Sequence, residues 1–157
     1  MYHYFQDNIE KDNINNLIDK IDVDEEVHLY FSTDGGDYDT MRYFIDFLNS
    51  KENIVVHLVE YVMSAGCLLF TDFKGKLIIE DGLEYLMFHV FDRQVYTLRK
   101  DALINDRILK IQTKQLNENF AKKIKQKGLL TDIQLKKYLK GYDVIVYAEQ
   151  IKEWKLN

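Results

Sequence analysis

The segment Val62–Cys67 places a serine where a nucleophile would be useful. Ser64 stands between an apolar segment with the composition of a strand and an apolar segment with the composition of a helix. The N-terminus of a helix stabilises negative charge, and the amide of Ala65 can point at the same oxyanion. Serine is also among the commonest helix N-caps, and taken alone Ser64 fits that role better.

A pair of glycines follows an earlier apolar segment, in the run Asp34-Gly35-Gly36. Paired glycines let the backbone adopt positive φ angles and turn its amides into a cleft, which would serve an oxyanion or a phosphate. A tight turn between a strand and a helix uses the same residues, and alone that interpretation is preferred. A Walker phosphate loop is excluded because no Gly-Lys-Ser/Thr sequence follows.

Two further residues with useful chemistry stand at the ends of apolar segments. His89 ends one such segment and Asp143 precedes another, after Gly141. A lone histidine in this position is usually a packed residue, and an aspartate after a glycine is usual in a turn. Cys67 is a rival nucleophile, but its apolar neighbours indicate a buried core thiol. None of these residues decides the chemistry alone, whereas their order and spacing do.

The elements around these residues alternate between helix and strand, and glycines separate them because the chain has no proline. Apolar residues at helical spacing, and short runs rich in branched and aromatic residues, predict both kinds of element. Helices between buried strands predict parallel pairing and the α/β class. The predicted helices cover 14–21, 41–48, 64–73, 95–127, 132–139 and the C-terminus, and the predicted strands cover 27–31, 54–59, 77–80, 85–89 and 144–147.

The longest predicted helix runs from about Val95 to Lys127 and stops at Gly128. A helix of some 30 residues spans about 45 Å, more than one side of a compact domain of this size. Part of its apolar stripe must therefore project, which predicts burial against another subunit.

Composition narrows the class of protein. The 157 residues are 46% hydrophobic and 30% charged, as in one soluble globular domain. The net charge of -5 argues against nucleic-acid binding, and the single cysteine against an intramolecular disulfide. No run of roughly 18 apolar residues and no secretory leader is found, so a cytoplasmic protein is expected. His3, His28 and His57 are interpreted as structural residues, and no cofactor or metal site is predicted.

Taken in order, these motifs resemble those of the Clp protease proteolytic subunit, in the ClpP/crotonase superfamily. FSTDGGDYDTM resembles its glycine loop, with Asp34 where proline is usual, and YVMSAGCLLF resembles its nucleophile segment. YLMFH resembles the strand that carries its histidine, and DVIVYAEQIKEWKLN the segment that begins with its aspartate. The stretch from about Val95 to Lys127 resembles its handle helix. The resemblance runs from about Val27 to the end.

The resemblance implies one ClpP-like domain over residues 1–157, with repeated β-β-α or βαβ units and a projecting handle helix. It also implies a serine-type endopeptidase in which Ser64 attacks the scissile carbonyl, His89 transfers the proton and Asp143 orients the histidine. The amides of Gly36 and Ala65 would hold the oxyanion. The substrates would be peptides or unfolded proteins, cut inside a homo-oligomeric ring or double ring.

Several alternatives stay open. A catalytically silent relative would keep the fold and serve as an assembly subunit, and Asp34 beside the oxyanion site suggests how activity would be lost. A crotonase-like acyl-CoA enzyme would share the fold, but the order of Ser64, His89 and Asp143 favours the peptidase. A binding domain without activity is the weakest alternative. The N-terminus does not clearly match the family's axial-pore loop, so an ATP-driven unfoldase partner is left open.

Overall fold

The computed structural model describes residues 1–22, 24–92 and 102–154. The chain forms two compact units. The first consists of Met1–Phe88 and Ile145–Asn157, and the second of His89–Val144. The interpretation of residues 1–157 as one ClpP-like domain stays a prediction.

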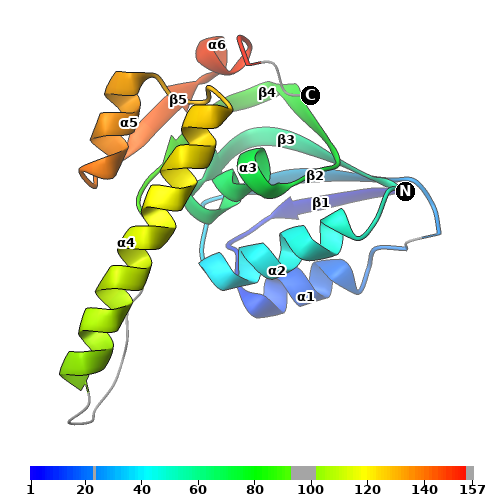
Figure 1. The fold of residues 1–157 in the computed structure, drawn as a ribbon. Helices are drawn as coiled ribbons and strands as arrows, with labels where there is room; N and C mark the ends of the chain where they lie inside the picture. Colours follow the sequence, from blue (N-terminus) through cyan, green and yellow to red (C-terminus); the bar gives the residue numbers. More distant parts are fainter. Residues whose placement is uncertain (23, 93–101, 155–157) are drawn as a thin grey trace. The chain divides into compact units, whose positions relative to one another are not determined.

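The first unit is built on a five-stranded sheet in the order β1-β2-β3-β4-β5 (Figure 1). The sheet is mixed, and the pairs β1–β2, β2–β3 and β3–β4 are parallel. The α/β class is therefore confirmed. The strands are β1 (Tyr2–Gln6), β2 (Val27–Thr33), β3 (Ile54–Met63), β4 (Lys76–Phe88) and β5 (Val144–Tyr147).

Helices α1 and α2 cover one face of this sheet (Figure 1). Residues on β2 alternate accordingly: Leu29 and Phe31 are fully buried, whereas Tyr30 on the opposite face is half-buried. The ring of Phe31 lies 6.1 Å from that of Phe44 on α2. The helices of this unit are α1 (Lys11–Ile18), α2 (Tyr38–Asn49), the 3-10 helix η1 (Ser64–Leu68), α3 (Leu69–Asp72) and α6 (Ala148–Ile151).

The start of α2 is tied to the glycine loop that precedes it. Asp37 is the N-cap of α2, and its carboxylate accepts a hydrogen bond of 2.7 Å from the amide of Thr40. Such a cap satisfies one of the amides that have no partner within a helix. Helix α2 therefore begins at Tyr38, only two residues after Gly36.

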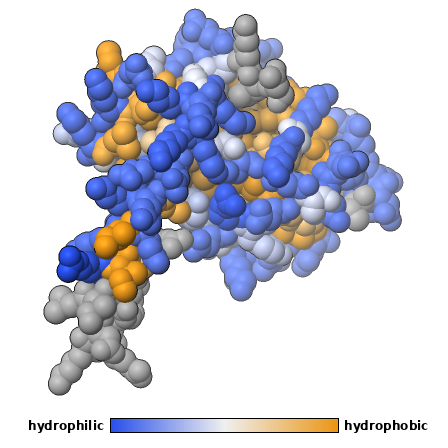
Figure 2. Space-filling model, in the orientation of Figure 1, coloured by the Kyte–Doolittle hydropathy of each residue, from blue (hydrophilic) through white to orange (hydrophobic). Residues whose placement is uncertain are grey.

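The second unit contains α4 (Ala102–Gln126) and α5 (Asp132–Leu139). Asn117 joins α4 to its neighbours, because its Oδ1 accepts hydrogen bonds from the amide of Phe91 at 2.7 Å and from the hydroxyl of Tyr138 at 3.0 Å. The ring of Phe120 lies 5.1 Å from that of Phe91. The lower half of α4 carries an apolar patch at Ile108 and Ile111, which are 48% and 52% exposed (Figure 2).

Most predicted elements are confirmed, including a helix at 132–139 and a strand at 144–147. The predicted helix at about 95–127 is confirmed over 102–126, and its residues 95–101 lie outside the described part of the chain. The separate strands predicted at 77–80 and 85–89 were wrong, because one strand, β4, runs through both. Strand β1 was not predicted, since Tyr2 and Tyr4 are exposed and leave too little apolar alternation.

Within the described ranges, no helix is both long enough and apolar enough to cross a membrane.

Candidate active site

Ser64 is the first residue of η1 and directly follows the end of β3 in the first unit. Its φ angle is 54°, in the left-handed region that residues other than glycine rarely adopt. Such strain persists only where the surrounding structure imposes it, and it is frequent at catalytic positions. A nucleophilic serine held on a strained strand-to-helix turn is also the device of the α/β-hydrolases. The backbone of Ser64 therefore shares its position and its strain with the serine of such a turn.

Close packing behind the turn holds it in place. A β-carbon on Gly66 would lie 2.6 Å from Cγ2 of Thr33 and 2.8 Å from Cγ1 of Val62. Only glycine fits there, so the first turn of η1 lies directly against β2 and β3. Ser64 itself is only 9% exposed.

The glycine loop lies against the same turn. Gly35 has a φ angle of 99°, and a β-carbon on it would lie 2.5 Å from the β-carbon of Ser64 and 3.1 Å from its Oγ. Gly36 has a φ angle of 145°, and a β-carbon there would collide with the backbone of Ile9. The structure thus brings the Asp34-Gly35-Gly36 loop to Ser64.

Two of the three backbone amides from Gly35 to Asp37 donate hydrogen bonds within the described part of the chain. The amide of Gly35 donates to Oγ1 of Thr33 at 3.0 Å, and that of Asp37 donates to the carbonyl of Ile9 at 2.8 Å. The amide of Gly36 has no hydrogen-bond partner among the described residues. Ala65 lies in the first turn of η1, where amides have no partner within the helix. Gly36 and Ala65 are therefore suited to donate to an oxyanion.

His89 and Asp143 come together in the second unit. Nδ1 of His89 lies 3.7 Å from Oδ1 of Asp143, and the two side chains are 36% and 67% exposed. Nδ1 is the nitrogen that the orienting carboxylate contacts in a serine-protease triad. The distance is that of an ion pair and exceeds the usual hydrogen bond, which often tightens only when substrate binds.

The predicted site residues are thus divided between the units. Ser64, Ala65 and Gly36 belong to the first unit, and His89 and Asp143 to the second. Each unit assembles its own part: the glycine loop with the serine, and the histidine with the aspartate. The complete triad belongs to the proposal below.

The rival nucleophile, Cys67, is buried as predicted. It is 0% exposed, and its thiol donates to the carbonyl of Met87 at 3.3 Å. Burial raises the pKa of the Cys67 thiol far above its ordinary value. A thiol is a nucleophile only as the thiolate, so Cys67 is a core residue.

Two histidines predicted to be structural form a hydrogen-bonded chain on the face of the sheet opposite α1 and α2. Nδ1 of His28 lies 2.8 Å from Nε2 of His57, and Nδ1 of His57 lies 2.6 Å from Oε1 of Glu80. The ring of Tyr30 stacks on that of His57 at 4.6 Å. The pairing of β2 with β3 produces this contact, which spacing along the sequence does not reveal.

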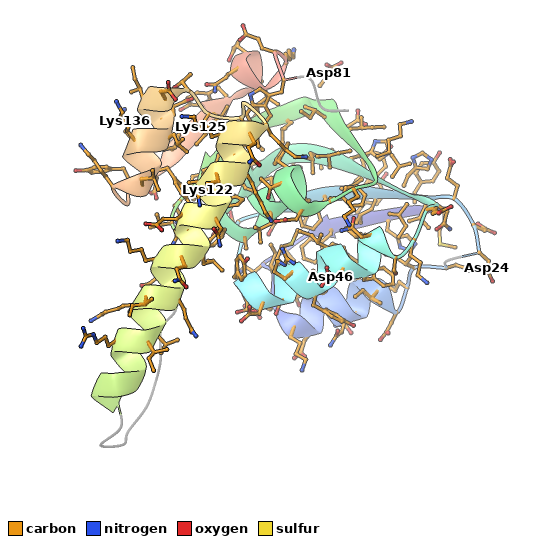
Figure 3. All side chains as sticks on the ribbon, in the orientation of Figure 1. Asp24, Asp46, Asp81, Lys122, Lys125 and Lys136 are labelled. Carbon is orange, nitrogen blue, oxygen red and sulfur yellow. The ribbon has the colours of Figure 1, made fainter. Side chains whose placement is uncertain are left out.

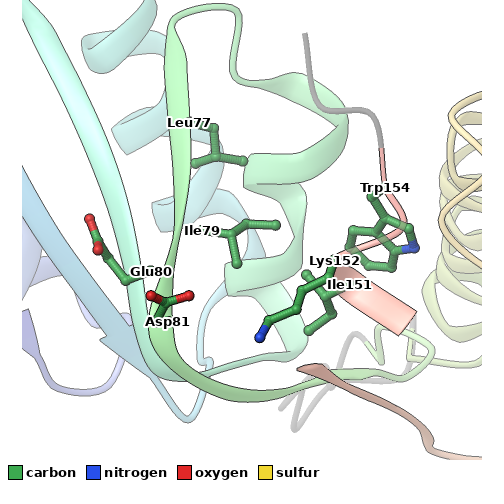
Figure 4. Close-up of a pocket in the computed structure, with 7 residues that line it drawn as sticks. All are labelled: Leu77, Ile79, Glu80, Asp81, Ile151, Lys152 and Trp154. Atoms are coloured by element: carbon green, nitrogen blue, oxygen red, sulfur yellow. The ribbon is translucent and has the colours of Figure 1, made fainter. Parts of the chain in front are cut away.

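A pocket of about 290 Å³ lies elsewhere in the first unit, between β4 and α6 (Figure 4). Its floor is apolar, with Leu77 and Ile79, and Lys152 extends toward Asp81 above it (Figure 4). Trp154 closes one side and is held edge-on by Phe70 at 5.4 Å. None of the predicted catalytic residues lines this pocket.

The two units differ in net charge, and the net charge of -5 for the whole chain does not reveal this difference. Residues 89–144 contain 13 lysines and arginines but only 6 aspartates and glutamates. Lys122 and Lys125 on α4 and Lys136 on α5 belong to this excess (Figure 3). The first unit carries the remaining acidic residues, including Asp46 and Asp81 (Figure 3).

No group of three or more histidine, cysteine, aspartate or glutamate residues in the described ranges is arranged to hold a metal ion. No protein-family model matches the chain, and no curated protein matches it.

Proposed function

We propose that this chain is the subunit of a ClpP-like serine peptidase that hydrolyses peptide bonds through Ser64, His89 and Asp143. The observation that carries the proposal is the left-handed turn at Ser64, with Gly35 packed against it. A turn that served only as a helix cap would not need a strained serine backbone. The proposed fold is the ClpP/crotonase arrangement, with α4 as the handle helix.

The proposed mechanism combines the residues of the first unit with the histidine and the aspartate of the second. The hydroxyl of Ser64 attacks the scissile carbonyl while Nε2 of His89 takes its proton and later passes it to the leaving amine. Asp143 contacts Nδ1 of His89, orients the ring and stabilises its charged form. The amides of Gly36 and Ala65 donate to the oxyanion, and each such donor lowers the barrier by about 3 kcal/mol. This chemistry uses no cofactor.

The exposed apolar patch of α4 supports a homo-oligomer. Ile108 and Ile111 lie three residues apart, so they share one face of the helix. Apolar side chains grouped on an exposed helix face are typical of an interaction surface. In the proposed ring or double ring these faces pair, and peptides or unfolded proteins are cut inside the cytoplasmic chamber. Whether an ATP-driven unfoldase binds this oligomer is left open.

One observation favours the second candidate, a silent assembly subunit. Asp34 directly precedes Gly35, whose backbone lies against Ser64, so it adds a negative charge to the loop of the proposed oxyanion site. A negative charge there opposes the developing negative charge of the tetrahedral intermediate. A silent subunit would keep the oligomer and the handle helix but cleave no peptide.

Hydrolysis of a fluorescently labelled unfolded protein separates these candidates. The proposed peptidase releases labelled peptides, and Ser64→Ala abolishes release while keeping the oligomer and the thermal unfolding temperature. A correctly assembled wild-type protein that releases no peptide above the Ser64→Ala background contradicts the peptidase and supports the silent subunit.

A further inference from the structure

Asp34 occupies a position from which it can contact a substrate at Ser64. A β-carbon on Gly35 would lie 2.5 Å from that of Ser64, so the two backbones are in direct contact. Because consecutive Cα atoms are about 3.8 Å apart, the Cα of Asp34 lies within about 8 Å of the Ser64 β-carbon. A lysine side chain and the side chain of Asp34 together span such a distance. The side chain of Asp34 is exposed.

No cation of the described residues pairs with the carboxylate of Asp34. Among the described residues, no ion pair and no hydrogen bond involves its side chain. Its neighbour Asp37 differs, because that carboxylate caps α2. Within the described ranges, the charge of Asp34 is therefore available to a bound molecule.

Two tyrosines stand on β3 and β4 near the end of β2, where Asp34 follows. Tyr61 stacks on Tyr85 with ring centroids 5.8 Å apart, and both side chains are half-buried. Thr33 pairs with Val62 across β2 and β3, so Asp34 and Tyr61 are each one residue from this pair. The charge of Asp34 is also the largest cause that raises the pKa of Tyr61, followed by burial. Tyrosine faces attract lysine and arginine cations, in addition to the attraction of the carboxylate.

We propose that Asp34, with Tyr61 and Tyr85, makes this site prefer peptides in which a lysine or arginine flanks the scissile bond. The proposal rests on the proposed peptidase function of Ser64. The cationic side chain pairs with Asp34, and its stem lies along the tyrosine rings. The same contact offsets the negative charge near the oxyanion site, so the preferred substrate supplies the cation that this loop lacks. Asp34 then determines substrate specificity and does not abolish activity.

The test compares internally quenched peptides that differ at one residue, which is either lysine or its uncharged analogue norleucine. One pair carries this residue directly before the cleaved bond, and a second pair directly after it. We expect kcat/KM to be about tenfold higher for lysine in at least one pair, since an exposed ion pair and a cation–π contact together contribute about that factor. The ratio of kcat/KM for the lysine peptide to kcat/KM for the norleucine peptide should be close to one in Asp34→Asn and below one in Asp34→Lys.

The matched control is Asp46→Asn, an exposed aspartate on α2 that keeps the wild-type ratio (Figure 3). A lysine-to-norleucine ratio near one in wild type, or a ratio that Asp34→Asn leaves unchanged, overturns the proposal. Labelling of Ser64 by a fluorophosphonate, measured on the same samples, separates the two failures. A labelled enzyme without the preference contradicts only the specificity, whereas an unlabelled one that cleaves none of the peptides contradicts the peptidase as well.

Discussion

Gly35 and Ser64 are so close that a β-carbon on Gly35 would lie 2.5 Å from the β-carbon of Ser64. The β-carbons of two residues essentially never approach so closely, so any residue larger than glycine at position 35 must displace Ser64 or the loop. Gly35 also has a φ angle of 99°, which other residues rarely adopt. The glycine loop and the turn at Ser64 therefore depend on each other, although Gly35 and Ser64 stand 29 positions apart along the chain.

Replacing Gly35 by alanine tests this dependence. The new methyl group must displace Ser64 or the loop, and the backbone must keep an unfavourable φ angle. We expect Gly35→Ala to lower the free energy of unfolding by about 3 kcal/mol, measured by urea denaturation. Reaction of Ser64 with a fluorophosphonate should fall at the same time, under conditions where the variant is still folded.

Gly82→Ala is the matched control for this substitution. A β-carbon on Gly82 meets nothing within 4 Å. The free energy of unfolding should therefore change by no more than about 0.5 kcal/mol, with labelling unchanged. Equal effects of both alanines would show that Gly35 does not constrain Ser64.

Asp143→Asn should reduce activity without loss of stability. The side chain is 67% exposed, so its replacement leaves the free energy of unfolding within about 0.5 kcal/mol. An amide holds the neutral histidine in the wrong tautomer, so kcat should fall by at least about a hundredfold. Asp92→Asn, another exposed aspartate of the second unit, should retain wild-type kcat. Full activity of Asp143→Asn would assign the third position of the triad to another residue.

The buried thiol of Cys67 should make stability fall at alkaline pH. Burial raises the pKa of this thiol in the folded state, whereas the unfolded chain loses the proton at about pH 8.5. Above that pH the unfolded state binds fewer protons than the folded state, so the free energy of unfolding decreases as pH rises. The raised pKa values of Tyr30 and Tyr61 act in the same direction at higher pH.

Between pH 8 and pH 10 we expect the Cys67 contribution to fall by about 2 kcal/mol. Urea denaturation of wild type and of Cys67→Ala at both pH values isolates this contribution, because the tyrosines are common to both proteins. The difference between the two proteins should shrink by that amount at pH 10. A difference that is independent of pH would mean that the thiol ionises in the folded state.

The apolar patch of α4 should control assembly. Ile111→Lys places a charge on a residue that is 52% exposed, so the fold should persist while the oligomer dissociates. Sedimentation velocity at micromolar concentration should find an oligomer in wild type and smaller species in the variant. Ile133→Lys on α5, where the isoleucine is 72% exposed, serves as the control and should assemble normally. A monomeric wild-type protein would contradict the oligomer.

Local patterns predicted most of the elements. The helix at 132–139 begins with a capping box between Thr131 and Gln134, and such short-range chemistry can be read from neighbouring residues. The one strand missed, β1, exposes Tyr2 and Tyr4 and is held by pairing with β2, which is a contact distant in sequence. The continuity of β4 through Gly82 was missed because glycine usually interrupts a strand.

For the candidate site, residue types and order predicted which side chains to examine, and the structure added the geometry. The contact of Gly35 with Ser64 and that of Gly66 with Thr33 join residues distant in sequence, and no local pattern encodes them or the left-handed backbone of Ser64. The chain from His28 through His57 to Glu80 depends on the register of three strands. The excess of basic residues over 89–144 was present in the sequence but hidden by the net charge.

The most direct test of the central claim is reaction of the purified protein with a fluorophosphonate probe, followed by location of the adduct by peptide mass. The account predicts one adduct at Ser64, lost in Ser64→Ala and strongly reduced in His89→Ala, while both variants keep the wild-type unfolding temperature. A folded, oligomeric wild-type protein that acquires no adduct at Ser64, or is labelled equally without His89, would contradict the assignment of these residues as a catalytic pair.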